Sequence, residues 1–346
     1  MISKLSLTNF RKFDLINLDL NSNLIIFEGS NAIGKTSILE SIYLVSTLKS
    51  ERVNQLNYLI KENKPFSKVV LEDSDNTYQI VLSNESKKCF INNVEIKRSR
   101  DFIGNLYSIY FSPQDLNLIT GSPNNRRHFL DLELSILNKK YLDTLSNAKY
   151  YLKQRNDALK SNADKSIINL LTDSLISEEI KISKSRIKFL NLLNEKLNNI
   201  HSTISNGERL ELKYVVSYDL ENTKDFYNAN YEKDKLLKTT TKGFHRDDFK
   251  IYLNNLEAQN FASQGQIRNI ALSIKLALVE LYESYLGKSP LLLLDDVFSE
   301  LDNKRQENLI RFLLNRDQTF ITTTSLESIP KVLLENAKII KLEEIK

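Results

Sequence analysis

The stretch Gly29-Ser30-Asn31-Ala32-Ile33-Gly34-Lys35-Thr36 decides the fold. It has the eight-residue pattern of a phosphate-binding loop, with glycine at positions one and six and Lys-Thr at its end. An apolar run over 23–28 predicts a strand before it, and an amphipathic pattern over 35–48 predicts a helix after it. In that setting the backbone N–H groups and the helix dipole favour bound phosphate. We therefore predict an ATP site in which Lys35 reaches the β- and γ-phosphates and the Thr36 hydroxyl ligates Mg²⁺. An ordinary glycine-containing turn is the alternative.

A second segment carries two carboxylates. Four consecutive leucines, 291–294, suit a central parallel strand that is buried on both faces, and Asp295-Asp296 follows them. Asp295 would hold Mg²⁺, directly or through water. Asp296 would lie nearer the γ-phosphate and orient or deprotonate the attacking water. A helix N-cap after a core strand is the alternative for either aspartate.

A third segment, Ser263-Gln264-Gly265-Gln266, has the form of a capping box. By itself it predicts only a good helix start. Together with the other two segments it predicts an anion contact, in which the Ser263 hydroxyl and the helix dipole face the anion and Gly265 clears space.

Composition restricts the class of protein. The chain has 346 residues, 41% of them hydrophobic, which is enough for two domains with real cores. The single cysteine, Cys89, excludes a disulfide framework and fits a reducing cytoplasm. No run approaches the roughly 18 apolar residues of a membrane span. Only eight glycines are present, and four of them lie in segments that we assign to the nucleotide: Gly29, Gly34, Gly243 and Gly265.

The pattern along the chain changes twice. Residues 1–120 read as strands and hairpins with one helix, 121–204 as a long antiparallel helical arm, and 205–346 as strands alternating with long helices. We expect an α/β fold in which 1–120 and 205–346 complete one domain and the arm is inserted into it. Residues 121–200 hold 14 Lys+Arg against 9 Asp+Glu, an excess of five. That surplus is a modest indication of polyanion contact, and a solvated helical face explains it as well.

With these segments in place, the chain resembles the RecF family of bacterial recombination mediators, which are ATP-binding-cassette-type (ABC-type) DNA ATPases. The similarity covers nearly the whole length. Five segments carry it: Leu7-Thr8-Asn9-Phe10-Arg11, Phe111–Leu116, Gly121–Asp131, Gly243–Asp248 and Leu293–Asp302. The departures are small. Phe244 replaces a proline, Asp296 replaces the glutamate of ABC transporters, and Thr323 stands where transporters carry a switch histidine. The shorter carboxylate of Asp296 is consistent with slow hydrolysis.

The resemblance implies an ABC-type ATPase head made of a first lobe of mixed sheets around the phosphate loop and a second, mostly helical lobe. It implies an ATP-driven homodimer in which the Ser263 helix of one copy contacts the γ-phosphate held by Lys35 of the other. Such a dimer would clamp DNA at gaps or single-strand/double-strand junctions and, with RecO and RecR, promote RecA loading. Weak, DNA-stimulated ATP hydrolysis would reset the clamp, in the cytoplasm.

Other functions remain as alternatives. The ATPase subunit of a membrane transporter is one, although the helical arm, the absent transporter-type signature and the Asn9-Phe10-Arg11 start argue against it. A scaffold whose nucleotide is only structural is another.

Several further side chains have two interpretations each. Arg11 and Lys12 either reach nucleotide phosphates or lie in an exposed turn. Arg126 and Arg127 either contact DNA or stabilise the base of the arm. Two other groups belong with them: Gln114 with Asp115 (a magnesium-sensing loop or a helix start), and His245 with its Arg-Asp-Asp neighbours (a structural network or a catalytic dyad).

Overall fold

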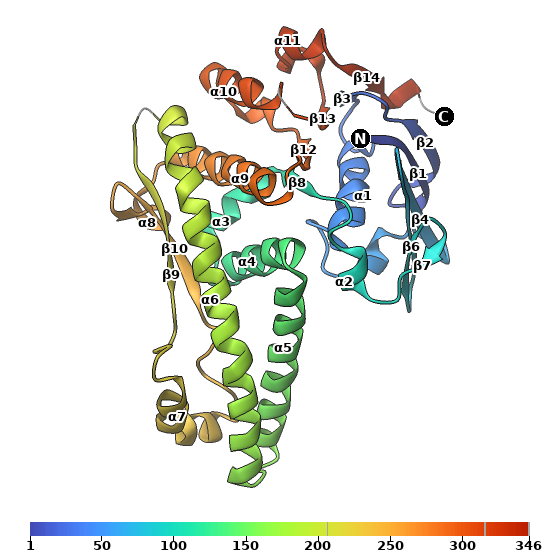
Figure 1. Cartoon of the computed structure of the whole chain (residues 1–346). Helices are drawn as coiled ribbons and strands as arrows, with labels where there is room; N and C mark the ends of the chain where they lie inside the picture. Colours follow the sequence, from blue (N-terminus) through green and yellow to red (C-terminus); the bar gives the residue numbers. More distant parts are fainter. Residues whose placement is uncertain (206, 315, 345–346) are drawn as a thin grey trace. The chain divides into compact units, whose positions relative to one another are not determined.

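The structure of the chain, a computed structural model, describes residues 1–205, 207–314 and 316–344. The chain divides into two compact units (Figure 1). The first joins Met1–Asp115 to Leu278–Lys346, and the second is Leu116–Ala277. The boundary near residue 277 falls inside helix α9 (Gln264–Leu286).

A five-stranded parallel sheet forms the centre of the first unit. Its order is β14-β3-β13-β12-β8, and all four pairings are parallel. The strands are β3 (Leu24–Glu28), β8 (Ser108–Phe111), β12 (Leu291–Asp295), β13 (Thr319–Thr323) and β14 (Lys338–Lys341). β12 is fully buried along its leucines, as expected for a parallel strand covered on both faces. The late strands therefore complete a sheet that the early strands begin, as predicted.

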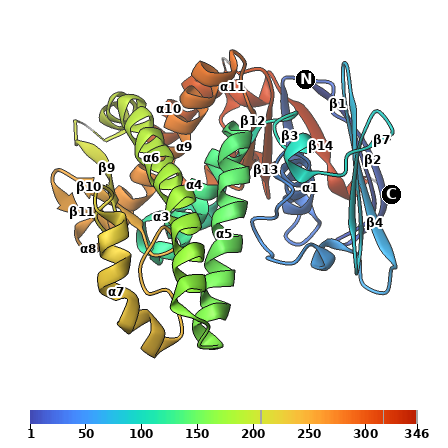
Figure 2. The ribbon, with the colours of Figure 1, turned by 60° about the horizontal axis from the view of Figure 1, so that its bottom comes forward.

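A six-stranded antiparallel sheet forms the other half of this unit. Its order is β2-β1-β4-β5-β6-β7. The strands are β1 (Ile2–Phe10), β2 (Phe13–Asp19), β4 (Phe66–Asp73), β5 (Thr77–Ser83), β6 (Lys87–Ile91) and β7 (Val94–Glu95). The predicted turn at Asn92-Asn93 has positive φ at both residues, which matches the twist of a tight hairpin. Helix α1 (Lys35–Thr47) contacts strands of both sheets (Figure 2).

The second unit is built on an antiparallel helix pair, α5 (Lys139–Lys160) and α6 (Lys165–Ile204). The chain reverses at 161–164, between the two helices. Two strands in the first part of 205–346, which was expected to complete the first domain, do not join the parallel sheet. They form β9 (Leu210–Val215) and β10 (Asp248–Leu253) of a separate antiparallel sheet, β11-β10-β9, with β11 (Leu256–Glu257). Because β9 packs against α6, this unit extends well past the expected arm of 121–204.

Two substantial helices of this unit were not predicted individually: α4 (Pro123–Leu137), which lies inside the expected helical arm of 121–204, and α7 (Thr223–Leu237), which lies outside it. The remaining short elements are η1 (Leu56–Leu59), α2 (Ser99–Phe102), η2 (Pro113–Leu116), α3 (Asn117–Thr120), α8 (Ala258–Phe261), η3 (Phe298–Glu300), α10 (Asn303–Leu313), η4 (Leu326–Ser328), α11 (Lys331–Leu334) and η5 (Leu342–Glu344). Within the described residues, none of the helices combines the length and apolarity that crossing a bilayer requires.

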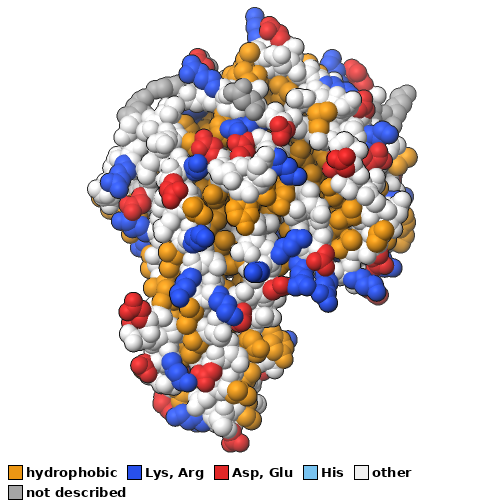
Figure 3. Space-filling model, viewed as in Figure 1, with side chains coloured by type: hydrophobic (Ala, Val, Ile, Leu, Met, Phe, Trp, Pro, Cys, Tyr) orange, Lys and Arg blue, Asp and Glu red, His pale blue; other side chains and the backbone are white. Residues whose placement is uncertain are grey.

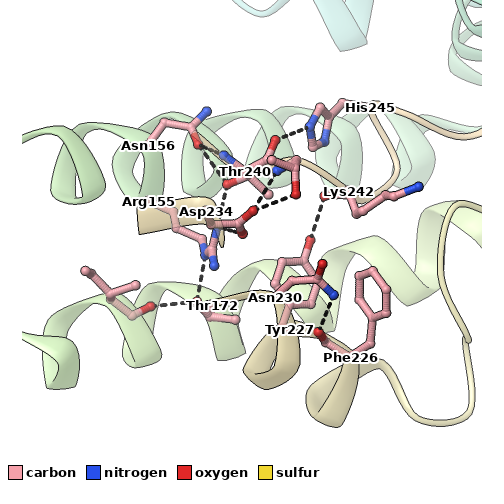
Figure 4. Close-up of polar contacts among 12 residues, drawn as sticks. Arg155, Asn156, Thr172, Phe226, Tyr227, Asn230, Asp234, Thr240, Lys242 and His245 are labelled. Atoms are coloured by element: carbon pink, nitrogen blue, oxygen red, sulfur yellow. Dashed lines mark hydrogen bonds and ion pairs between the residues drawn. The ribbon is translucent and has the colours of Figure 1, made fainter. Parts of the chain in front are cut away.

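A buried polar network joins the helices of the second unit (Figure 4). The Arg155 guanidinium donates to Asp234 Oδ2 at 2.9 Å, to Thr240 Oγ1 at 2.6 Å and to Thr172 Oγ1 at 2.8 Å. The Nε2 atom of His245 lies 3.1 Å from the carbonyl oxygen of Thr240. Since a buried charge needs several hydrogen-bond partners, these contacts fix α5, α6, α7 and the 240–245 loop together.

The two arginines at the base of α4 belong to the same kind of network. Arg126 donates through Nε and Nη2 to both oxygens of Asp248, at 2.8 and 2.9 Å. Arg127 donates to the carbonyl oxygen of Asp247 at 2.8 Å. For Arg126 and Arg127, these contacts favour a role in stabilising the base of the arm over contact with DNA. For the segment around His245, they favour a structural network over a catalytic dyad.

Candidate nucleotide site

The phosphate loop connects β3 to α1 as predicted. Gly34 is the N-cap of α1 with φ of 114°, a left-handed conformation, and a side chain at this position would collide with the ring of Phe13. The Lys35 ammonium donates to the carbonyl oxygens of Gly29 and Ser30 at 2.5 and 3.0 Å. The lysine is therefore folded back over its own loop.

Asp295 lies at the carboxyl end of β12, directly beside the start of α1. Its Oδ1 accepts hydrogen bonds from Thr36 Oγ1 at 2.9 Å and from Thr322 Oγ1 at 2.8 Å. Its Oδ2 accepts one from the Tyr110 hydroxyl at 3.1 Å. A carboxylate and a hydroxyl held this close are hard oxygen donors of the kind that Mg²⁺ prefers, so Thr36 and Asp295 fit a magnesium site.

Asp296 turns the chain out of the sheet. Its φ is 53°, in the left-handed region that aspartate and asparagine tolerate better than other non-glycine residues, and its N–H donates to Thr322 Oγ1 at 3.0 Å. Burial raises the pKa of the Asp296 carboxyl and the charge of Asp295 adds to this, while Ser299 and Lys35 oppose it. Burial also shifts the pKa of the Lys35 ammonium, which it lowers, while the charges of nearby carboxylates act to raise it. Both shifts are typical of a functional cleft.

The loop and both aspartates line one cleft of about 830 Å³. The predicted residues in its wall are Arg11, Lys12, Asn31, Ala32, Gly34, Lys35, Thr36, Asp295 and Asp296. Gly29, Ser30 and Ile33 belong to the loop but are not part of that wall. Seven wall residues were not predicted. Four of them, Arg52, Tyr58, Ile60 and Glu62, lie in a segment after α1 that carries no motif, and the others are Ser37, Pro113 and Thr324.

Arg11 and Lys12 lie in the cleft wall, and both side chains donate hydrogen bonds to other residues of the protein. Arg11 donates through Nε and Nη2 to Glu40 at 2.8 and 2.7 Å, and through Nη1 to the carbonyl oxygen of Tyr58 at 3.2 Å. The Glu40 side chain is almost fully buried, so this ion pair ties the first hairpin to α1. Lys12 donates to the carbonyl oxygen of Ala32 at 2.5 Å. Phosphate contact by either residue stays a prediction.

Ser263 and Gly265 lie in the second unit, at the start of α9. The predicted capping box is present: Ser263 N donates to Gln266 Oε1 at 2.8 Å, and Gln266 N donates to Ser263 Oγ at 3.3 Å. Ser263 is exposed, as a residue that contacts a second copy must be in the free chain. Gln114 is exposed in η2. The described part of the chain has no group of three or more His, Cys, Asp or Glu side chains placed to hold a metal ion. The roles of Ser263, Gly265 and Gln114 stay predictions.

A parallel sheet that brings a loop lysine, the loop threonine and a strand-end aspartate into one cleft, with a large second unit inserted, is the architecture of an ABC-type ATPase head. Solved structures share it. The head domain of Smc from Pyrococcus furiosus matches 98% of this chain and 92% of its own, with a TM-score of 0.55 at 16% identity, which shows the fold alone. A structure of the recombination mediator protein RecF with ATP, in the RecFOR pathway, matches 100% of this chain and 96% of its own, with a TM-score of 0.91 at 27% identity.

Curated sequences are more similar still, although no protein-family model matches the chain. The DNA replication and repair protein RecF of Acholeplasma laidlawii is 40% identical over 326 residues, 93% of each chain. That of Bacillus subtilis is 36% identical over 99% of this chain and 98% of its own. The chain therefore belongs to the RecF family of DNA replication and repair proteins.

Proposed function

We propose that this protein is an ATP-gated DNA clamp of recombinational repair, which closes as a homodimer on ATP and reopens after slow hydrolysis. One observation carries the ATP half of the proposal: Lys35, Thr36, Asp295 and Asp296 share a single cleft although up to 261 residues separate them. The DNA-repair half of the proposal rests on the relatives, which are DNA replication and repair proteins. A structure of one such recombination mediator, RecF with ATP, matches 100% of this chain.

Within the cleft each side chain has a role that its geometry supports. Lys35 leaves the loop carbonyls and binds the triphosphate, since its ammonium is held there only by two neutral oxygens. Thr36 and Asp295 hold Mg²⁺, which neutralises phosphate charge when bound. Asp296 accepts a proton from the attacking water, and burial raises its pKa, which makes it a stronger base than an ordinary aspartate.

The dimer half rests on Ser263. Its exposed hydroxyl caps a long helix whose first turn includes Gly265, and such a helix start favours an anion. We propose that it meets the triphosphate held by the partner copy. Family membership supports the further proposal that the protein binds RecR and RecO and promotes RecA loading.

The basic surplus of the middle segment has a definite place in the structure. Helix α5 exposes Lys139, Lys149, Lys153 and Lys160, and the spacing of the last three puts them on one side of the helix. Lys and Arg side chains are visible on the arm, the lower part of the view in Figure 3. Tyr150, which follows Lys149 on this helix, is 58% exposed. We propose this face as a contact for DNA phosphates.

A salt titration of DNA binding tests this face. In the presence of ATP, Lys149→Glu/Lys153→Glu should weaken binding to gapped DNA and make the dependence of affinity on salt less steep, by about two in the log–log slope. Lys233→Glu/Lys235→Glu is the matched control, because it makes the same charge change at exposed sites on α7 of the same unit. Equal losses in both variants would reject the α5 face. No ATP-dependent DNA binding by the wild type would reject the clamp.

A further inference from the structure

The end of the chain reaches back to the phosphate loop. β14 pairs with β3 in parallel, and the register sets Lys341 beside Glu28, the last residue before the loop. The turn η5 then begins with the buried side chain of Leu342, which anchors it. As a result Glu343 lies at the loop, and its Oε1 accepts a hydrogen bond from the backbone N–H of Ser30 at 2.6 Å.

Two charged groups thus hold the same residue of the loop. Glu343 accepts from the N–H of Ser30, and the Lys35 ammonium donates to its carbonyl oxygen at 3.0 Å. Neither Ser30 nor Glu343 is part of the cleft wall, whereas Lys35 is. The carboxylate therefore contacts the loop from outside the space that the nucleotide would fill.

We propose that Glu343 is a positioning residue, a proposal that rests on the proposed binding of ATP. Glu343 holds the phosphate loop in its binding conformation while Lys35 turns to the triphosphate. When the ammonium leaves the carbonyls of Gly29 and Ser30, the loop loses both of those contacts. The bond from Ser30 N–H to Glu343 does not depend on the lysine and remains. A loop that keeps its shape loses less conformational freedom on binding, which favours affinity.

The charge of Glu343 affects ATP binding in the opposite direction to its hydrogen bond, and this difference can be tested. A carboxylate near the loop repels a triphosphate, so removing its charge alone should strengthen ATP binding. The pKa of Glu343 is lowered, first by the hydrogen bond from the Ser30 amide, so the group is charged at neutral pH. Positioning and repulsion therefore predict opposite effects for the loss of this side chain.

Three variants separate the two effects in a fluorescent-ATP binding titration of the full chain with Mg²⁺. Glu343→Ala should weaken ATP binding by about fivefold, the size of one lost hydrogen bond. Glu343→Gln keeps an acceptor without the charge, so it should bind as the wild type does or more tightly. Glu344→Ala is the control. Glu344 is exposed and lies 3.9 Å from Lys341 in a surface ion pair, so this substitution should not change ATP binding.

Each outcome bears on the proposal. Weaker binding by Glu343→Ala with recovery in Glu343→Gln, at unchanged melting temperatures, supports positioning. Equal affinities of Glu343→Ala and Glu343→Gln, whether at or above that of the wild type, would overturn it. A wild type that does not bind ATP would instead reject the proposed function, so the two failures are distinguishable.

Discussion

The hydroxyl of Thr36 donates to Asp295 Oδ1 at 2.9 Å, across 259 positions of sequence. Thr36 is at the start of α1 and Asp295 at the end of β12, and α1 packs against β12 in the first unit. Because the strands β3 and β12 are parallel and share β13 as a neighbour, both end at the same edge of the sheet. That edge is where ligands bind in open α/β sheets.

Asp295→Asn should reduce Mg²⁺-dependent ATP hydrolysis by at least about 100-fold, since the amide is a poor ligand for a hard cation. The asparagine keeps an oxygen that accepts from Thr322, so the fold should be retained. The measurement is turnover against Mg²⁺ concentration, with Tyr110→Phe, which removes the hydrogen bond to Oδ2, as a control. Full activity of Asp295→Asn would contradict the magnesium site.

Lys35→Arg should impair hydrolysis and weaken ATP-dependent dimer formation. A planar guanidinium cannot replace a compact ammonium that must move from two loop carbonyls to phosphate oxygens. Phosphate release and size-exclusion chromatography with ATP measure the two effects. Unaltered turnover in this variant would count against the loop assignment.

Asp296→Asn should remove hydrolysis while ATP binding persists, because asparagine tolerates the left-handed backbone of this position but cannot take up a proton. The pH profile adds a second readout. Since burial raises the pKa of Asp296, the wild-type rate should fall on acidification at a higher pH than an ordinary aspartate would give. A rate that does not change until the ordinary aspartate range would exclude Asp296 as the base.

Ser263→Arg should block ATP-dependent dimerisation and leave nucleotide binding by the single chain intact. The larger, charged side chain would stand on an exposed helix start that we propose faces the partner's triphosphate. Light scattering with and without ATP measures the dimer, and fluorescent-ATP titration measures binding. A dimer of normal affinity would reject the shared site.

Glu179→Gln should change how stability depends on pH. Glu179 is fully buried in α6, where it accepts from the Tyr227 hydroxyl at 2.7 Å and from Phe244 N at 2.5 Å. Burial raises its pKa from 4.5 to about 7. Between those pH values the folded state binds more protons than the unfolded state, so wild-type stability falls as pH rises from about 4.5 to 7.

The glutamine does not titrate. The free energy of unfolding of Glu179→Gln should therefore rise, relative to that of the wild type, by up to about 3 kcal/mol as the pH increases from 4.5 to 8. Denaturant unfolding at several pH values measures the difference. Glu178→Gln is the neighbouring control, because Glu178 pairs with the exposed Lys181 on the surface. A constant difference between Glu179→Gln and wild type across this range would show that Glu179 does not titrate there.

Local patterns predicted much of the first unit. The strands and hairpins expected in 1–120, the strand over 23–28, the helix over 35–48 and the phosphate loop all depend on near neighbours in sequence, and each is found where expected. The segment 205–346 was also recognised as containing strands, but its first part, which includes β9, was assigned to the first domain and belongs to the second unit. Alternation shows that one face of a strand is buried, but it does not show against which partner.

Helices α4 and α7 were missed for a related reason. Polar residues dominate both, and their burial comes from contacts with distant elements rather than from a strong apolar stripe. In α7 the side chain of Asp234 is buried by its ion pair with Arg155 of α5. The same holds for Tyr58 and Arg52, whose place in the cleft wall follows from the path of an irregular loop.

The sequence by itself determined the chemistry of the site: a lysine, a threonine and two carboxylates in motifs whose local backbone is set by glycines and by a leucine strand. Only the tertiary structure decided that 205–277 belongs to the second unit, that Arg126 is bound to Asp248, and that Glu343 holds the phosphate loop. The physical reason is range. Backbone propensity and side-chain periodicity act over a few residues, whereas strand pairing and buried charge pairs join residues that only the folded chain brings together.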